Sequence, residues 1–147
     1  MAYLVKDPQQ YKVYAWEGEI ISPRSHSHVL YNNAQAFVDG IFLAEGWLYP
    51  PKISPKPLQS TTYVADGARD NIRLRSEGCK SWVLIHEICH SLTSEIDGSS
   101  NMHNADFLGI YIMMITKYCN IALPLLLYTA TQAGLNYNLS AKPWFKT

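Results

Sequence analysis

"HEICHSLTSEIDGSSNMHNADF", residues 86–107, holds three of the five histidines in the chain and a glutamate directly after the first of them. His86 and His90 are four positions apart, a spacing that puts two side chains about one turn apart on the same face of a helix. Two imidazoles in that position can bind one metal ion. The stretch therefore predicts a metal site on a helix.

The residues around the first two histidines support a helix that begins near Ser81. Apolar side chains recur here at intervals of three and four, which places one side of the helix in the core. These residues are Trp82, Ile85, Cys89 and Leu92. We expect the Cys89 thiol to be buried among them rather than to bind metal. The polar run "DGSSN", which contains Gly98, is expected to end the helix.

A catalytic zinc ion usually has three protein ligands and one open position, so a third ligand is needed. Glu95, Asp97, His103 and Asp106 are the candidates that follow the helix. Glu95 is only five residues beyond His90 and cannot easily turn back. His103 follows a polar loop and directly precedes the next helix, so we favour it. Asp106 has two interpretations, a carboxylate that orients an imidazole or an acidic residue stabilised by the helix dipole.

Glu87 is offset from the two histidines by one residue, which places it beside the metal ion and not on it. From there a carboxylate can hold a water molecule and take its proton, so we predict Glu87 as the general base. Tyr111 and Tyr137 are candidate donors to an oxyanion. The sequence, with ten tyrosines, does not discriminate between them.

The rest of the chain is expected to mix strands and helices without strict alternation, which is typical of the α+β class. We expect a strand at 11–21, a polar loop around 22–28, a helix at 29–45 ended by Gly46, a stiff proline-rich loop at 49–57, a hairpin formed by "TTYVAD" and "NIRLR", a helix at 105–121, and a helix between Pro124 and Gly134.

Length and composition favour one compact domain over residues 1–147. The chain is 48% hydrophobic and 16% charged, with a formal net charge of zero. Because no positive charge is in excess, we expect no strong autonomous binding to nucleic acid and none to membranes. The three cysteines form no CxxC pair, the N-terminus does not resemble a signal peptide, and no apolar run reaches the roughly 18 residues of a spanning helix. We therefore expect a cytoplasmic protein.

Several motifs resemble those of a known family. "HEICH", twelve intervening residues and "HNADF" are similar to the pattern of SprT-like zinc metalloproteases, and "NIRLRSEGCKSWVLIHEICHSL" resembles their strand and active-site helix. A closer resemblance, over most of the chain, is to small HExxH metallohydrolases of actinobacteria and their phages, through "KDPQQYKVYAWE" and "ALPLLLYTATQAGLNYN". In this chain Asn104 replaces the glycine of the HGxxF-type motif, and asparagine also accepts left-handed turns. The C-terminal cysteine-rich zinc ribbon of many SprT proteins is missing.

The resemblance implies a zincin-like single domain, with a small twisted sheet, an HExxH helix, and a following helix that carries the third ligand at its start. It implies Zn²⁺ bound by His86, His90 and His103, with Glu87 as the base. In metalloproteases of the kind that the chain resembles, a substrate lies extended along a sheet edge, and "NIRLR", residues 71–75, is the candidate edge strand. The expected function is that of a zinc metallopeptidase acting on a protein or peptide substrate, in the bacterial host cell if the chain is phage-encoded. Two alternatives are a metal-dependent hydrolase of a non-peptide substrate and a non-catalytic, zinc-stabilised interaction module.

Overall fold

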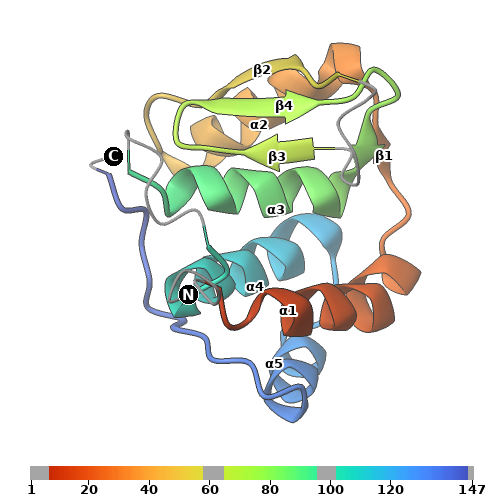
Figure 1. The fold of residues 1–147 in the computed structure, drawn as a ribbon, viewed down its shortest axis with the longest axis vertical. Helices are drawn as coiled ribbons and strands as arrows, with labels where there is room; N and C mark the ends of the chain where they lie inside the picture. The colour runs from red at the N-terminus through yellow and green to blue at the C-terminus, as the bar shows by residue number, and fades with distance from the viewer. Residues whose placement is uncertain (1–6, 58–64, 96–101, 146–147) are drawn as a thin grey trace, which may run out of the picture. The chain divides into compact units, whose positions relative to one another are not determined.

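The computed structural model describes residues 7–57, 65–95 and 102–145. In these residues the chain forms five α-helices and two small β-sheets, so the α+β class is confirmed. The chain divides into two compact units (Figure 1). The first comprises residues 1–26 and 102–142, and the second residues 27–101 and 143–147.

The first unit begins with helical structure where we expected a strand. Helix α1 (Gln10–Trp16) continues into a π-helix, η2 (Glu17–Ile21), and a 3-10 turn, η3 (Ser22–Arg24). Val13, Trp16 and Ile21 are at most 2% exposed and repeat at helical intervals. The prediction was wrong because it weighed the β-branched and aromatic composition above this spacing.

The two other helices of this unit agree with the sequence. Helix α4 (Ala105–Cys119) buries the four predicted core residues Phe107, Ile110, Tyr111 and Met114. Helix α5 (Leu123–Gln132) has a proline in its first turn, and Gly134 follows it with a positive φ of 75°. Asn104 is extended, not left-handed, and its side chain accepts a hydrogen bond from the Phe107 amide. Asparagine at this position therefore caps α4, which differs from our expectation.

The second unit contains a three-stranded sheet in the order β2 (Lys52–Pro55), β4 (Asn71–Leu74), β3 (Ala65–Gly67). Strands β3 and β4 are antiparallel, which confirms the hairpin for the described residues; 58–64 lie outside them. Strand β2 pairs with β4 in parallel, so the proline-rich stretch is not only a loop. Because β4 is the central strand, "NIRLR" is not an edge strand and that prediction was wrong.

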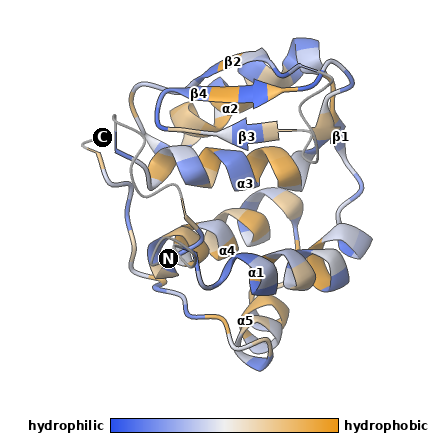
Figure 2. Cartoon of the chain, viewed as in Figure 1, coloured by the Kyte–Doolittle hydropathy of each residue, from blue (hydrophilic) through white to orange (hydrophobic). Residues whose placement is uncertain are grey.

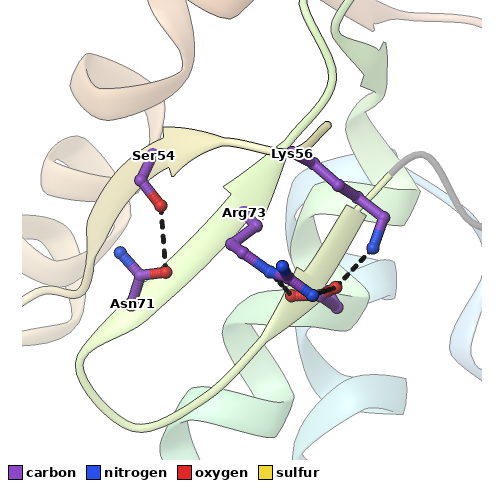
Figure 3. Close-up of polar contacts among 5 residues, drawn as sticks. Ser54, Lys56, Asn71 and Arg73 are labelled. Atoms are coloured by element: carbon purple, nitrogen blue, oxygen red, sulfur yellow. Dashed lines mark hydrogen bonds and ion pairs between the residues drawn. The ribbon is translucent and has the colours of Figure 1, made fainter. Parts of the chain in front are cut away.

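Side chains hold the register of this sheet on its polar face. Lys56 and Arg73 both donate to the carboxylate of Asp66, and Ser54 donates to Asn71 (Figure 3). On the opposite face, Ile72 and Leu74 are fully buried. Figure 2 shows that hydrophilic and hydrophobic residues alternate along β4. This alternation fixes which face of the strand packs on the core.

A second, two-stranded sheet leads directly into the helix of the HExxH motif. Strand β1 (His28–Val29) pairs with β5 (Cys79–Lys80), so the predicted polar loop around 22–28 ends in a short strand. Helix α2 (Tyr31–Glu45) ends at Gly46 with a φ of 76°, as predicted. Helix α3 (Ser81–Leu92) follows β5 without a gap and lies along β3 (Figure 1). It ends before Gly98, which lies outside the described residues.

Candidate functional site

Most residues of helix α3 are buried, on nearly every side of the helix. Its apolar side chains, those of Leu84, Ile85, Ile88, Cys89 and Leu92, are fully buried, while Trp82 is half-buried. The expectation of a buried Cys89 is confirmed. His86, Glu87 and His90 are also buried, with 6 to 8% of each residue exposed. Burial of polar and ionisable side chains costs free energy unless they have polar partners, so three of them on one helix mark a candidate functional site.

His86 and His90 lie one turn apart on α3, as the four-residue spacing predicted. The centroids of their rings are 4.9 Å apart, and the ring planes meet at 63°. Rings this close and edge to face can direct one nitrogen each toward a common ion. Two neutral imidazoles would fill two of the four positions of a tetrahedral zinc ion.

The C-terminal turn of α3, which carries His90, is held by side-chain hydroxyl groups. Thr93 Oγ1 donates to the carbonyl of Cys89 at 2.8 Å, and Ser94 Oγ donates to that of His90 at 2.6 Å. On the same turn Ser91 Oγ donates to the carbonyl of Arg69 at 2.6 Å. The Thr93 amide also donates to the carbonyls of Cys89 and His90 at 3.1 and 3.3 Å, so the hydroxyl groups add to the backbone bonds that end the helix. The Ser91 bond ties this turn to the loop before β4.

The backbone of Glu87 lies directly against strand β3. A Cβ added to Gly67 of β3 would stand only 2.5 Å from the carbonyl oxygen of Glu87, so no larger residue fits there without a shift. The carboxylate also affects Cys79 of β5. Burial, and next the negative charge of Glu87, raise the pKa of the Cys79 thiol to about 12. The Glu87 carboxylate therefore lies close enough to Cys79 for its charge to act on the thiol.

His103 belongs to the other unit, just before α4, and it is 4% exposed. Its Nδ1 lies 2.7 Å from Oδ2 of Asp7, and its backbone amide donates to the same oxygen at 3.2 Å. Gln9 Nε2 donates to its carbonyl at 2.9 Å. The rings of Tyr14 and Phe107 meet the imidazole edge to face, with centroid distances of 5.2 and 5.0 Å. His103 is thus held on its backbone and on three sides of its ring.

The structure describes two of the other three candidate ligands, Glu95 and Asp106. Glu95 is exposed, and Asp97 lies outside the described residues. Asp106 is half-buried in the first turn of α4, where its Oδ1 accepts a hydrogen bond from Asn138 at 3.2 Å. Asp7, which was not among the candidates, places its carboxylate against the His103 imidazole. Sequence reasoning missed Asp7 because no local pattern links it to a histidine 96 positions away.

The two candidate oxyanion donors have partners of their own. The Tyr111 hydroxyl group donates to Oε2 of Glu17 at 2.6 Å in the buried interior of the first unit. Tyr137 shares a hydrogen bond of 3.1 Å with Thr131 at an exposed position. Glu17, which we assigned to a strand, is a buried carboxylate on the π-helix η2.

Comparisons with known proteins supply no relative for this chain. No family model matches it, and neither a curated protein nor a solved structure does. Membership of the SprT-like family therefore stays a prediction. No helix in the described ranges is both long and apolar enough to cross a membrane.

Proposed function

We propose that this chain is a zinc-dependent hydrolase of the metallopeptidase type, in which His86, His90 and His103 bind one zinc ion and Glu87 is the general base. The ligand set is supported by chemistry and burial. Each of the three histidines is buried and offers one ring nitrogen. Together the three nitrogens could hold a metal ion. Three nitrogen ligands and no thiolate suit a zinc ion that keeps one position for a substrate or water.

The observation that carries the proposed role of Glu87 as a base is its burial. Glu87 lies between His86 and His90 in the sequence of α3. Only 8% of this glutamate is exposed, although glutamate is among the residues least often buried. A structural zinc site needs no carboxylate beside its ligands, whereas hydrolysis needs a base there. When bound, zinc would polarise the scissile carbonyl and lower the pKa of water. Glu87 would take the proton of the attacking water and return it to the leaving amine.

The zincin-like arrangement is part of the same proposal. Its support within the second unit is a small sheet whose edge strand β3 lies along the HExxH helix. Among the described strands β3 has a neighbouring strand on one side only, and the other edge of such a strand can pair with an extended peptide. We therefore transfer the expected substrate edge from β4, which is central, to β3.

A second candidate is a zinc-stabilised interaction module without catalysis. The observation in its favour is that the proposed ligands come from two separate stretches of chain, α3 and the segment before α4. A single ion would link these stretches, which is the usual role of a structural zinc ion. The two candidates differ in whether Glu87 has any function.

Exchange of Glu87 for glutamine separates them. Glutamine keeps the shape of the side chain but cannot accept a proton, so peptide hydrolysis should fall by about a hundred- to ten-thousand-fold. Zinc content, measured by elemental analysis, should remain that of the wild type. The assay would use a mixture of fluorescence-quenched peptides at saturating zinc.

His90→Ala and His103→Ala are the matched metal variants and should lose both zinc and activity. Full zinc retention in His103→Ala would exclude this histidine as the third ligand. A Glu87→Gln protein that cleaves peptides as fast as the wild type would contradict the catalytic proposal. Zinc binding by a wild type that cleaves no peptide of the mixture would favour the interaction module or a non-peptide substrate.

A further inference from the structure

The N-terminal segment before α1 meets His103 through two side chains with separate tasks. Gln9 is 8% exposed and holds backbone groups: it donates to the carbonyls of His103 and Asn136 and accepts from the Asn136 amide at 2.6 Å. Asp7 is the residue that reaches the imidazole. Its Oδ2 accepts from both the backbone amide and Nδ1 of His103.

The contact with Asp7 decides which nitrogen of His103 carries the proton. A carboxylate can only accept, so Nδ1 must be the protonated nitrogen of the neutral ring. The lone pair is then on Nε2, at the far side of the ring. A histidine that binds a metal ion commonly donates its other N–H to a carboxylate, which fixes the tautomer and the orientation of the ring and raises the basicity of the ligand nitrogen.

We propose that Asp7 is the positioning residue of the metal site: it holds His103 in the tautomer that presents Nε2 to the ion. This inference rests on the proposed function, since it assigns a role to Asp7 at the same site. Asp7 does not bind the ion. Its effect passes through His103, and it makes the segment before α1 part of the site.

The surroundings of Asp7 fit a role beside a cation better than a purely structural one. Within the described residues its Oδ1 is buried and has no hydrogen-bond partner. Placing a carboxylate oxygen in that position is unfavourable unless positive charge lies nearby. A zinc ion on the opposite side of the imidazole would supply that charge. The backbone of His103 is already held by Gln9, so the loop does not depend on Asp7 alone.

The proposal can be tested with the Asp7→Asn variant. Its zinc affinity would be measured by competition with a chromophoric chelator. Asparagine has nearly the same volume, but it can also donate through its amide nitrogen and so no longer fixes the tautomer. We expect zinc binding to weaken by about 10- to 100-fold, the usual cost of removing such a partner. Asp7→Glu, which keeps the carboxylate, should recover part of the loss. Asp39→Asn, on the surface of α2, is the matched control and should bind zinc as the wild type does.

Nitrogen NMR of labelled histidine in the metal-free wild type gives a second measurement that needs no variant and no activity. It should find the His103 proton on Nδ1 when the ring is neutral. A proton on Nε2 would overturn the inference, and so would wild-type zinc affinity in Asp7→Asn. Failure of the wild type to bind zinc would instead overturn the proposed function, while the NMR result would still decide the tautomer.

Discussion

Gly67 of strand β3 faces the backbone of Glu87 on helix α3 so closely that a Cβ on it would stand 2.5 Å from the Glu87 carbonyl oxygen. The carbonyl carbon and Cα of Glu87 would each be 3.1 Å away. All three atoms belong to the helix backbone, which cannot turn aside as a flexible side chain can. Glycine at position 67 therefore allows β3 to lie this close to the backbone of Glu87, the residue proposed as the base.

Replacing Gly67 by alanine should force β3 and α3 apart at this point. Overpacking of this kind costs about 1–3 kcal/mol of unfolding free energy. Urea unfolding would measure the loss. If Glu87 is the general base, peptide hydrolysis should also fall, because the strand and the helix that carries the base would no longer keep their spacing.

Gly40→Ala is the matched control for this change. Gly40 lies inside helix α2, and a Cβ there would have no atom within 4 Å. Alanine is favoured over glycine inside helices by about 0.5–1 kcal/mol, so Gly40→Ala should stabilise the protein. An unfolding free energy of Gly67→Ala equal to that of the wild type would contradict the close approach.

Helices α3 and α4 could be predicted from sequence because their signals are local. The apolar residues of α3 and α4 repeat at three and four positions, and the interval between His86 and His90 is one helical turn. Gly46 and Gly134 follow helix ends and have positive φ values, which glycine adopts without strain. Such features depend on neighbours in sequence, so one chain is enough to detect them.

Features that depend on distant pairing could not be predicted. Strand β2 forms inside a proline-rich run because β4 pairs with it in parallel; Pro55, which cannot donate a hydrogen bond, is the last residue of this edge strand. The helical structure at 10–21 was missed for a different, local reason: its aromatic and β-branched residues also suit a strand. The contact between Asp7 and His103 joins segments 96 positions apart and leaves no local pattern.

The carboxylate of Asp66 on β3 binds two cations, Arg73 of β4 and Lys56, which directly follows β2 (Figure 3). Lys56 Nζ lies 2.6 Å from Oδ2, and Arg73 donates to both carboxylate oxygens at 3.0 and 2.8 Å. The Lys56 side chain is only 7% exposed, whereas that of Asp66 is 41% exposed. Asp66→Asn would leave a buried ammonium group without its counter-charge.

We expect Asp66→Asn to lower the unfolding free energy by about 1–3 kcal/mol, less than for a fully buried pair because water screens the exposed carboxylate. Burial alone would raise the pKa of Asp66, but hydrogen bonds from Arg73 and Lys56 outweigh it and lower the pKa from 3.8. The stabilisation is therefore complete above pH 3.8 and is lost as the pH falls through the lowered value. Urea unfolding of both proteins over this range should show the difference shrinking with acid; a constant difference would contradict the ion pairs.

Cys79 offers a measurement of the charge on Glu87 that does not involve metal or substrate. The folded protein raises the pKa of this thiol from 9.0 to about 12, through burial first and the negative charge of Glu87 second. Because the folded pKa is higher than the unfolded one, the neutral thiol contributes stability that is complete below pH 9.0. This contribution is lost as the pH rises toward 12.

The unfolding free energy of the wild type should therefore decrease more steeply between pH 9.0 and 12 than that of Cys79→Ala, which has no thiol to ionise. The comparison cancels the lysines and tyrosines that titrate in the same range in both proteins. Glu87→Gln should lie between the two, because it removes the charge and leaves the burial. Parallel curves for the wild type and Cys79→Ala would show that the thiol has an ordinary pKa. A Glu87→Gln curve equal to that of the wild type would show that the Glu87 carboxylate is uncharged or too far from Cys79 to affect it.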